Sequence, residues 1–341
     1  MTAQNFKVTV IIPNYNHAPY LPQRIDSVLN QTFQDFEVLL LDDCSSDNSR
    51  EIIAEYASRD PRIRVVLNEH NSGSTFKQWN KGIALAKGQY VWIAESDDYA
   101  ELDFLATLVA RLDENSRVGL AYCQSFSVDE NGTPLLTGLL ATATWAPFYT
   151  DLDPELWKND FTLPGLGLVR RFMSYRNIIP NASAVLLRRA ILEHVGPADE
   201  SFRIVGDWLF WVKILAVCDA SFVARPLNYF RSHLNNVRTK TRDDGTVLIE
   251  FTKLFAIMKQ YGETAKDLYH RSLEDFFATW FEAFTHRQIP LARHLVVYSN
   301  LVALEPKIRL RMVRALRSLL MRNKFSGLRN LITHKVLRIP T

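Results

Sequence analysis

Two adjacent carboxylates, Asp97 and Asp98, follow an apolar run that predicts a buried strand, Tyr90–Ala94, after only Glu95 and Ser96. Paired carboxylates at the tip of a buried strand are unfavourable unless another group compensates their charge. Hard divalent cations such as Mg²⁺ bind through one or two carboxylates together with the phosphates of a substrate. These residues therefore indicate a metal site that holds a phosphorylated ligand. The alternative is that Ser96, Asp97 and Asp98 only cap the helix that follows.

The elements that must position these carboxylates are predicted by alternating strand and helix signals over the first 127 residues. Short apolar runs predict strands at 7–12, 36–41, 63–67 and 90–94, and helical spacing predicts helices at 20–30, near 47–56 and at 74–86. Such alternation predicts an α/β fold with a parallel sheet and helices on both faces. Ligands of such sheets bind beyond the carboxyl ends of the strands, where the polar clusters 13–16, 42–43 and 97–98 lie.

The second part of the chain has a different pattern. It predicts strands at 118–127, 182–187 and 227–231, an apolar helix at 208–218, and helices from about residue 246 onward. Residues 133–180 show no sustained period, which is typical of a functional loop. Two roles are compatible with the Trp-rich stretch at 145–157: it forms a sugar-stacking surface, or it covers the core.

Composition limits the class of protein. The 341 residues, 47% of them hydrophobic, suffice for one large domain or two ordinary ones. We expect no secretory signal, because the apolar stretch at 8–12 is too short, and no membrane span, because 291–304 falls short of about 18 apolar residues. The cysteines show no metal-ligand spacing, so we expect reduced thiols in a cytoplasmic protein. They are Cys44, Cys123 and Cys218.

Basic residues are concentrated at the carboxyl end of the chain. Residues 305–341 contain ten basic residues and one acid, Glu305, which gives a net charge of +9 in a chain whose total is +3. Such a segment is expected to meet a membrane surface, a nucleic acid or an acidic partner. Apolar residues interleave with the arginines, which predicts a basic amphipathic helix on an anionic leaflet. The alternative is that the apolar face packs on the protein and the arginines are solvated.

No glycine motif for phosphates is present. The chain lacks both the dinucleotide fingerprint and the Walker loop, which argues against a dinucleotide oxidoreductase. After the first strand it has Pro13-Asn14-Tyr15-Asn16-His17 instead. A bound nucleotide must therefore have its phosphates neutralised in another way, and a metal on Asp97 and Asp98 supplies that charge.

Four motifs in this order resemble the family 2 glycosyltransferases: VIIPNYN at 10–16, SVLNQTF at 27–33, LDDCSSD at 41–47 and GQYVWIAESDD at 88–98. The resemblance covers roughly residues 7–235. It implies the GT-A fold, a mostly parallel nucleotide-binding sheet flanked by helices, here with a helical carboxyl-terminal extension. It further implies inverting sugar transfer from a nucleotide-diphosphate sugar.

The resemblance also implies a division of the chain. We expect a GT-A glycosyltransferase domain at 1–240, with a nucleotide-sugar half at 1–127 and an acceptor half at 128–240. Residues 241–341 are then a helical, basic extension.

The resemblance carries roles over to individual donor-binding residues. Pro13 and Tyr15 would line the nucleoside pocket, and Asp43 would accept a hydrogen bond from the imide N–H of uracil or thymine. The donor is then a UDP- or dTDP-sugar. From the residues alone, Asp43 could also belong to an ordinary turn. Lys77 could reach a base or phosphate, or could be a solvated surface lysine.

The resemblance assigns a metal and a base as well. Asp98 would meet Mn²⁺ or Mg²⁺ directly, Asp97 would meet the ribose or the metal, and His233 falls where some members place a further metal or diphosphate ligand. Asp207 occupies the place of the catalytic base, although from position alone it could be a plain helix cap. The family often has Glu-Asp at this place, and this chain has Gly206 before the Asp.

Together with the residues, the resemblance implies an inverting, metal-dependent glycosyltransferase of bacterial polysaccharide biosynthesis. Its acceptor would be a hydroxyl of a saccharide or of a lipid-linked molecule. We expect a cytoplasmic enzyme at the inner face of the cytoplasmic membrane, attached through 305–341, with no nucleic-acid partner. The alternative from another class is a catalytically silent nucleotide-sugar-binding protein on the same fold.

Overall fold

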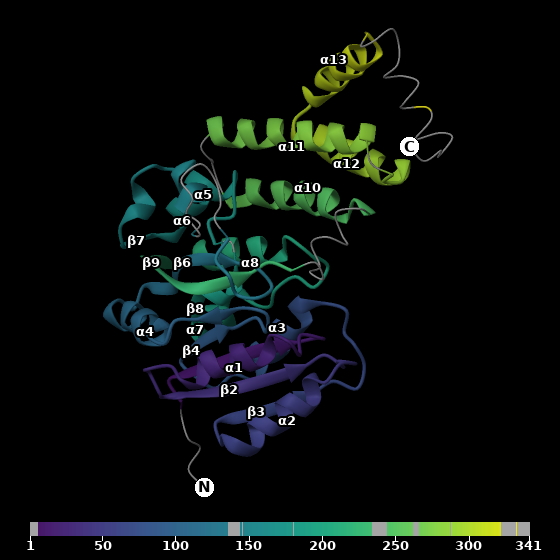
Figure 1. The fold of residues 1–341 in the computed structure, drawn as a ribbon. Helices are drawn as coiled ribbons and strands as arrows, with labels where there is room; N and C mark the ends of the chain where they lie inside the picture. Colours follow the sequence, from purple (N-terminus) through teal and green to yellow (C-terminus); the bar gives the residue numbers. More distant parts are fainter. Residues whose placement is uncertain are drawn as a thin grey trace. The chain divides into compact units, whose positions relative to one another are not determined.

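The apolar runs of the first part of the chain form a buried parallel sheet in the computed structural model of the protein (Figure 1). Every residue of β1 (Val8–Asn14), β2 (Phe36–Asp42) and β4 (Tyr90–Ile93) is buried. β1 lies between β2 and β4 and runs parallel to both, and β3 (Ile63–Leu67) pairs parallel with β2. Strands covered on both faces have continuous apolar sequences, which explains why the sequence of this chain predicts them.

Helices follow these strands as the sequence predicts: α1 (Leu21–Leu29), α2 (Ser49–Arg59), α3 (Thr75–Leu85) and α4 (Phe104–Glu114). α3 packs very closely on the sheet at Gly82. A Cβ atom there would lie 2.5 Å from Cγ2 of Ile11 and 3.0 Å from Cδ1 of Leu41. Glycine is therefore required where this helix crosses β1 and β2.

The sheet becomes mixed beyond β4. Its strand order is β3-β2-β1-β4-β8-β6-β9-β5, and β7 pairs with β9. β8 (Val185–Arg188) is antiparallel to β4 and to β6 (Val118–Val128). β9 (Asp219–Arg231) is parallel to β6 but antiparallel to β5 (Tyr99–Ala100) and β7 (Phe161–Pro164). The predicted α/β fold is confirmed, and parallel pairing holds for β3, β2, β1 and β4 and again for β6 with β9.

Two predictions about the second part are corrected by the structure. β9 begins well before residue 227, because Pro226 lies at a register shift opposite Gln124 instead of ending the strand. The segment 133–180 also contains regular structure within its described part. It holds α5 (Ala146–Thr150), β7 and α6 (Gly165–Leu168), and it precedes α7 (Arg189–Val195) and α8 (Gly206–Leu215).

The structure describes residues 6–135, 144, 146–179, 181–233, 244–261, 266–286, 288–321 and 332. The chain divides into two compact units, 1–173 with 177–233, and 174–176 with 234–341. The second unit has helices from residue 246 as predicted: α10 (Thr246–Met258), α11 (Lys266–His286), α12 (Leu291–Leu304) and α13 (Ile308–Met321). They share an apolar core that includes Phe255, Trp280 and Leu301. In the part of the chain that the structure describes, no helix has the length and apolar character needed to cross a membrane.

Candidate active site

The segments that follow β1, β2 and β4 meet at the carboxyl edge of the sheet. The backbone N–H of Asp43 donates to the carbonyl of Asn14 at 2.9 Å, and that of Ala94 donates to Ile11 at 2.8 Å. Residues after one strand therefore lie beside residues after the next. This is the edge at which ligands of parallel sheets bind.

Two residues in these segments have left-handed backbone conformations. Asn16 has φ 55° and Cys44 has φ 64°, values that non-glycine residues rarely adopt. Asn16 is fixed by its side-chain Oδ1, which accepts from the backbone N–H of Ser46 at 2.7 Å. Cys44 turns the chain directly after Asp43. Such conformations concentrate at functional sites.

Asp43 is buried, and its two oxygens are unequally used. Oδ1 accepts from Nδ2 of Asn68 at 2.6 Å, from the backbone N–H of Ser72 at 2.9 Å and from Nε2 of Gln78 at 2.9 Å. Oδ2 accepts only the hydroxyl of Ser72, at 2.7 Å, among the described residues. A carboxylate has about four acceptor sites. Oδ2 therefore retains capacity for one more donor, such as an imide N–H.

The other predicted donor-binding residues differ in their surroundings. Pro13 is buried within β1 opposite Leu41. Tyr15 is 45% exposed, so its ring is available to a ligand. Lys77 has an exposed side chain whose Nζ donates to the carbonyl of Ser72 at 3.3 Å. Lys77 belongs to α3, and this contact places its side chain against the loop that holds Asp43.

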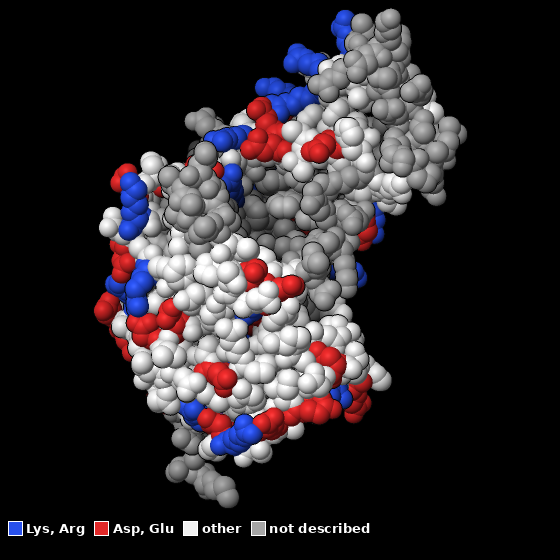
Figure 2. All heavy atoms as spheres, viewed as in Figure 1, with Lys and Arg blue, Asp and Glu red and all other residues white. Residues whose placement is uncertain are grey.

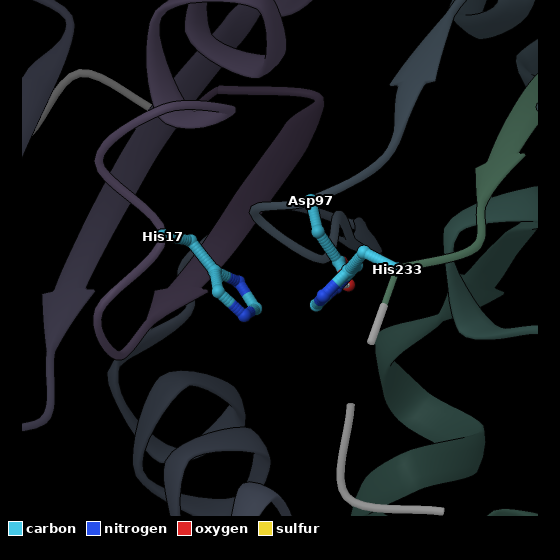
Figure 3. A group of neighbouring side chains, drawn as sticks. All are labelled: His17, Asp97 and His233. Atoms are coloured by element: carbon cyan, nitrogen blue, oxygen red, sulfur yellow. Dashed lines mark hydrogen bonds and ion pairs between the residues drawn. The ribbon is translucent and has the colours of Figure 1, made fainter. Parts of the chain in front are cut away.

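A second group of side chains, which we call the His–Asp cluster, consists of His17, Asp97 and His233 (Figure 3). Each offers one ligand atom, and these atoms lie within 4.8 Å of one another. Nε2 of His233 is 3.0 Å from Oδ2 of Asp97, and Nδ1 of His17 is 2.8 Å from the hydroxyl of Ser96. The three members come from the segment after β1, the segment after β4 and the end of β9. The sequence predicted Asp97 and His233 as ligands, but not His17.

Asp98 lies outside the His–Asp cluster. It is 2% exposed, and its Oδ1 accepts the backbone N–H of Arg231 at 2.9 Å. Nε of Arg231 donates to the carbonyl of Asp97 at 2.7 Å, and Nη2 donates to Oε1 of Gln23 at 2.6 Å. In this structure Asp98 joins the turn after β4 to the end of β9, whereas Asp97 faces the histidines.

The segment 95–98, which follows β4, is called the acidic turn here. Burial and mutual repulsion decide the protonation of its carboxyl groups. Burial raises the pKa of Glu95 to about 8, and repulsion from Asp97 adds to the shift, although Nε1 of Trp79 donates to its Oε1. Burial also raises the pKa of Asp98, again with repulsion from Asp97. Burial opposes the charge of Asp97, but the hydrogen bond with His233 and the attraction of His17 and His233 together outweigh burial and hold its pKa below the usual value. Asp97 is therefore the carboxylate of this turn that ionises most readily.

A buried cation lies against this turn. Arg24 is fully buried, and its Nε donates to the carbonyl of Glu95 at 2.8 Å. Its Nη1 and Nη2 have no hydrogen-bond partner among the described residues, and its Cζ lies 5.5 Å from the centre of the Trp92 ring. Burial lowers the pKa of Arg24 to about 10, so it stays charged at neutral pH. Sequence reasoning missed it, although an arginine on the apolar face of a predicted helix, between Leu21 and Val28, was the available signal.

Asp207 lies in the first turn of α8. Its Oδ2 accepts from Nδ2 of Asn177 at 3.4 Å, and the residue is half-buried. Gly206 before it is fixed by packing, because a Cβ atom would lie 2.6 Å from the ring of Phe76. The glutamate that the family often has at this place would therefore clash with α3. α8 also contacts α3 through Trp211 and Trp79, whose ring centres are 5.9 Å apart, and Trp79 bonds to Glu95 of the acidic turn.

The Trp-rich stretch contributes to the core where the structure describes it. Trp157 is 5% exposed and stacks on Tyr149, with ring centres 5.1 Å apart. Its Nε1 donates to the hydroxyl of Tyr122 at 3.0 Å. Of the two interpretations of this stretch, the burial of Trp157 supports the one in which it covers the core. Trp145 lies outside the described residues.

The chain is similar to known sugar-transferring proteins. Residues 9–178 match the family model described as glycosyl transferase family 2. The putative teichuronic acid biosynthesis glycosyltransferase TuaG of Bacillus subtilis (strain 168) is 36% identical over 128 residues, which are 38% of this chain and 50% of that protein. The alignments with this and the other first curated relatives span half of their length or less.

Solved structures share the fold. S. aureus TarS 1-349, crystallised with UDP, has a TM-score of 0.65 at 19% identity, over 96% of this chain and 88% of that one. The mannosyltransferase PcManGT from Pyrobaculum calidifontis, in complex with GDP-Man and Mn²⁺, has a TM-score of 0.54 at 15% identity, over 98% of this chain and 88% of that one. The expected GT-A fold is thereby confirmed.

Proposed function

Because the chain belongs to glycosyl transferase family 2 through residues 9–178, we propose that it is an inverting enzyme that transfers a sugar from a UDP- or dTDP-sugar. The acceptor is a hydroxyl of a saccharide or of a lipid-linked molecule, and the pathway is bacterial polysaccharide biosynthesis. The observation that carries this proposal is the His–Asp cluster, which lies at the edge of the sheet where Asp43 also lies.

The donor base binds between Tyr15 and Asp43 in this proposal. The exposed ring of Tyr15 offers a stacking surface, and Oδ2 of Asp43 has room for the imide N–H of uracil or thymine. Asp43 is held by Asn68, Ser72 and Gln78, so its carboxylate is oriented before the donor arrives. Such preorganisation lowers the cost of binding. TarS, which shares the fold, was solved with UDP.

The residues present fit a divalent cation. Asp97 and His233 offer ligand atoms, and Nδ1 of His233 is buried without a hydrogen-bond partner among the described residues. We place Mn²⁺ or Mg²⁺ on Asp97 and His233, with Asp98 next to them. When bound, the cation supplies Lewis-acid stabilisation of the leaving diphosphate.

Asp207 removes the proton of the acceptor hydroxyl in this mechanism. Its place in the first turn of α8 favours the anionic form through the helix dipole, and Asn177 orients one oxygen. One carboxylate is enough, because a diphosphate is a good leaving group. A glycosidase would need two opposed carboxyl groups instead.

The function is tested with a panel of nucleotide-sugars. We expect a UDP- or dTDP-sugar to raise the melting temperature of the purified chain in the presence of Mn²⁺, and to be hydrolysed slowly without acceptor. Binding without any turnover, even with acceptor present, would favour the catalytically silent binder. No stabilisation by any nucleotide-sugar would exclude both functions.

We also propose that α13 attaches the protein to an anionic membrane surface. Ile308 is buried in the helical core, but Leu310 is 53% and Val313 is 61% exposed, so apolar side chains also face outward. Basic side chains stand beside them on the described part of α13 (Figure 2): the exposed ones are Arg309, Arg314 and Arg317. A helix with arginines beside outward apolar residues fits a leaflet surface better than a fully solvated face. The rest of 305–341 lies mostly outside the described residues.

Membrane attachment is tested by liposome co-sedimentation of a variant with Arg309, Arg314 and Arg317 all changed to Gln. Each basic residue near an anionic surface contributes about 1 kcal/mol, so binding should weaken by about two orders of magnitude. The matched control changes the exposed Arg59, Arg117 and Arg171 of the first unit to Gln and should bind normally. Binding should also need anionic lipid and weaken at high salt. Equal partitioning of both variants would rule out α13 as the anchor.

A further inference from the structure

His17 is the member of the His–Asp cluster that the sequence did not predict. It lies two residues beyond Tyr15, in the segment after β1, whereas the other members come from the far side of the site (Figure 3). Its ring contacts those of Tyr20 and His233, with ring centres 6.0 Å and 5.4 Å away. The ring is therefore held against the cluster and does not extend into solvent.

The hydrogen bond of His17 fixes which ring atom faces the cluster. Nδ1 lies 2.8 Å from the hydroxyl of Ser96, so Nε2 is the atom left for a ligand. Histidines that bind metals almost always use their second nitrogen in such a hydrogen bond, which sets the tautomer and the ring orientation. Ser96 immediately precedes Asp97, so the same turn orients one ligand and supplies another.

His233 provides an independent sign that a ligand belongs here. Its side chain is 2% exposed, its Nε2 contacts Asp97, and its Nδ1 has no hydrogen-bond partner among the described residues. A buried imidazole with an unused nitrogen, facing a second imidazole and a carboxylate, is an arrangement that a cation would complete.

We propose that His17 is a ligand of the cation, which makes the site a set of two imidazoles and one carboxylate that prefers a transition metal to Mg²⁺. This inference rests on the proposed function only for the role of the cation, since binding itself is measured without transfer. Mg²⁺ takes oxygen ligands almost exclusively, whereas imidazole nitrogen suits first-row transition metals. With two of three protein ligands nitrogen, Mn²⁺ or Co²⁺ is bound more tightly than Mg²⁺.

The test is direct titration of the full chain with metal, using EPR for Mn²⁺ and visible absorption for Co²⁺. His17→Gln should weaken binding of both ions by more than tenfold, since even loss of an outer partner of a ligand costs about 10–100-fold. The Co²⁺ absorption should also change, because a nitrogen ligand is lost. His194→Gln, which changes an exposed histidine of α7, is the matched control and should leave both titrations unchanged.

A second variant keeps the inference open to refutation if His17→Gln alters the fold. His17→Asp replaces nitrogen by oxygen and should shift preference toward Mg²⁺ by at least tenfold relative to Mn²⁺. Unchanged Mn²⁺ affinity and Co²⁺ absorption in His17→Gln, with binding lost in Asp97→Asn, would overturn the role of His17 and leave the proposed function standing. Absence of any metal binding by the natural chain, with or without UDP, would instead refute the metal-dependent function itself.

Discussion

Replacing Asp207 by Asn lowers turnover by about 10²–10⁴-fold, the contribution that general-base catalysis typically makes. An amide cannot take the proton of the acceptor hydroxyl, but it is the same size as the carboxylate. It can also keep the contact with Asn177 and the place in the first turn of α8. Donor affinity should hardly change, because the base faces the acceptor. Steady-state kinetics and calorimetric titration with the donor measure the two effects separately.

The control for this prediction is Glu193→Gln, which changes an exposed acid on α7 and should leave turnover and donor affinity unchanged. A collapse of donor affinity in Asp207→Asn would assign Asp207 to the nucleotide site instead of the acceptor side. Unchanged turnover would show that Asp207 is not the base. It would favour the alternative interpretation, in which Asp207 only caps the start of an apolar helix.

The carboxyl edge of the parallel strands was predictable because its signals are local. Buried strands such as β1 and β2 are continuous apolar runs, and the polar residues that end them, including Asp43 and Asp97, follow at once in the sequence. The residues at this edge of the sheet can therefore be predicted from the sequence without knowledge of the fold. The pairing of β8 with β4 and β6 is different, because antiparallel contacts between distant segments leave no local signal.

The residues that were missed act through contacts between distant segments. His17 is close to His233 in space but far from it in sequence, and an isolated histidine on a turn has no distinguishing pattern. Arg24 occupies a position that helical spacing assigns to the core, where its charge is balanced by an acidic turn that comes much later in the chain. Adjacent Asp97 and Asp98 look equivalent in sequence, and their surroundings differ only through contacts with distant segments: His233 for the carboxylate of Asp97 and the backbone of Arg231 for that of Asp98.

Removal of the cation is expected to abolish transfer completely. Excess EDTA should stop turnover, and Mn²⁺ should restore it, because Asp97, the nearby Asp98 and the donor diphosphate otherwise repel one another. Asp97→Asn and Asp98→Asn should both lose turnover while keeping the fold, but they should differ in metal affinity. Asp97→Asn should lose Mn²⁺ binding, since its carboxylate belongs to the His–Asp cluster. Asp98→Asn should bind Mn²⁺ within about tenfold of the natural chain, since its Oδ1 is used by the backbone of Arg231.

Two outcomes would contradict the requirement for a metal or its assignment to Asp97. Full activity in excess EDTA would show that the diphosphate is neutralised without a metal, and the guanidinium groups of Arg24 and Arg231, which donate to carbonyls of the acidic turn, would then be the cations beside it. Loss of Mn²⁺ binding in Asp98→Asn with binding retained in Asp97→Asn would transfer the cation to Asp98. In that case the hydrogen bond from Arg231 must break or be shared when metal binds, and the end of β9 must move with it. Circular dichroism and the melting temperature of each variant, measured with EDTA, separate such effects from unfolding.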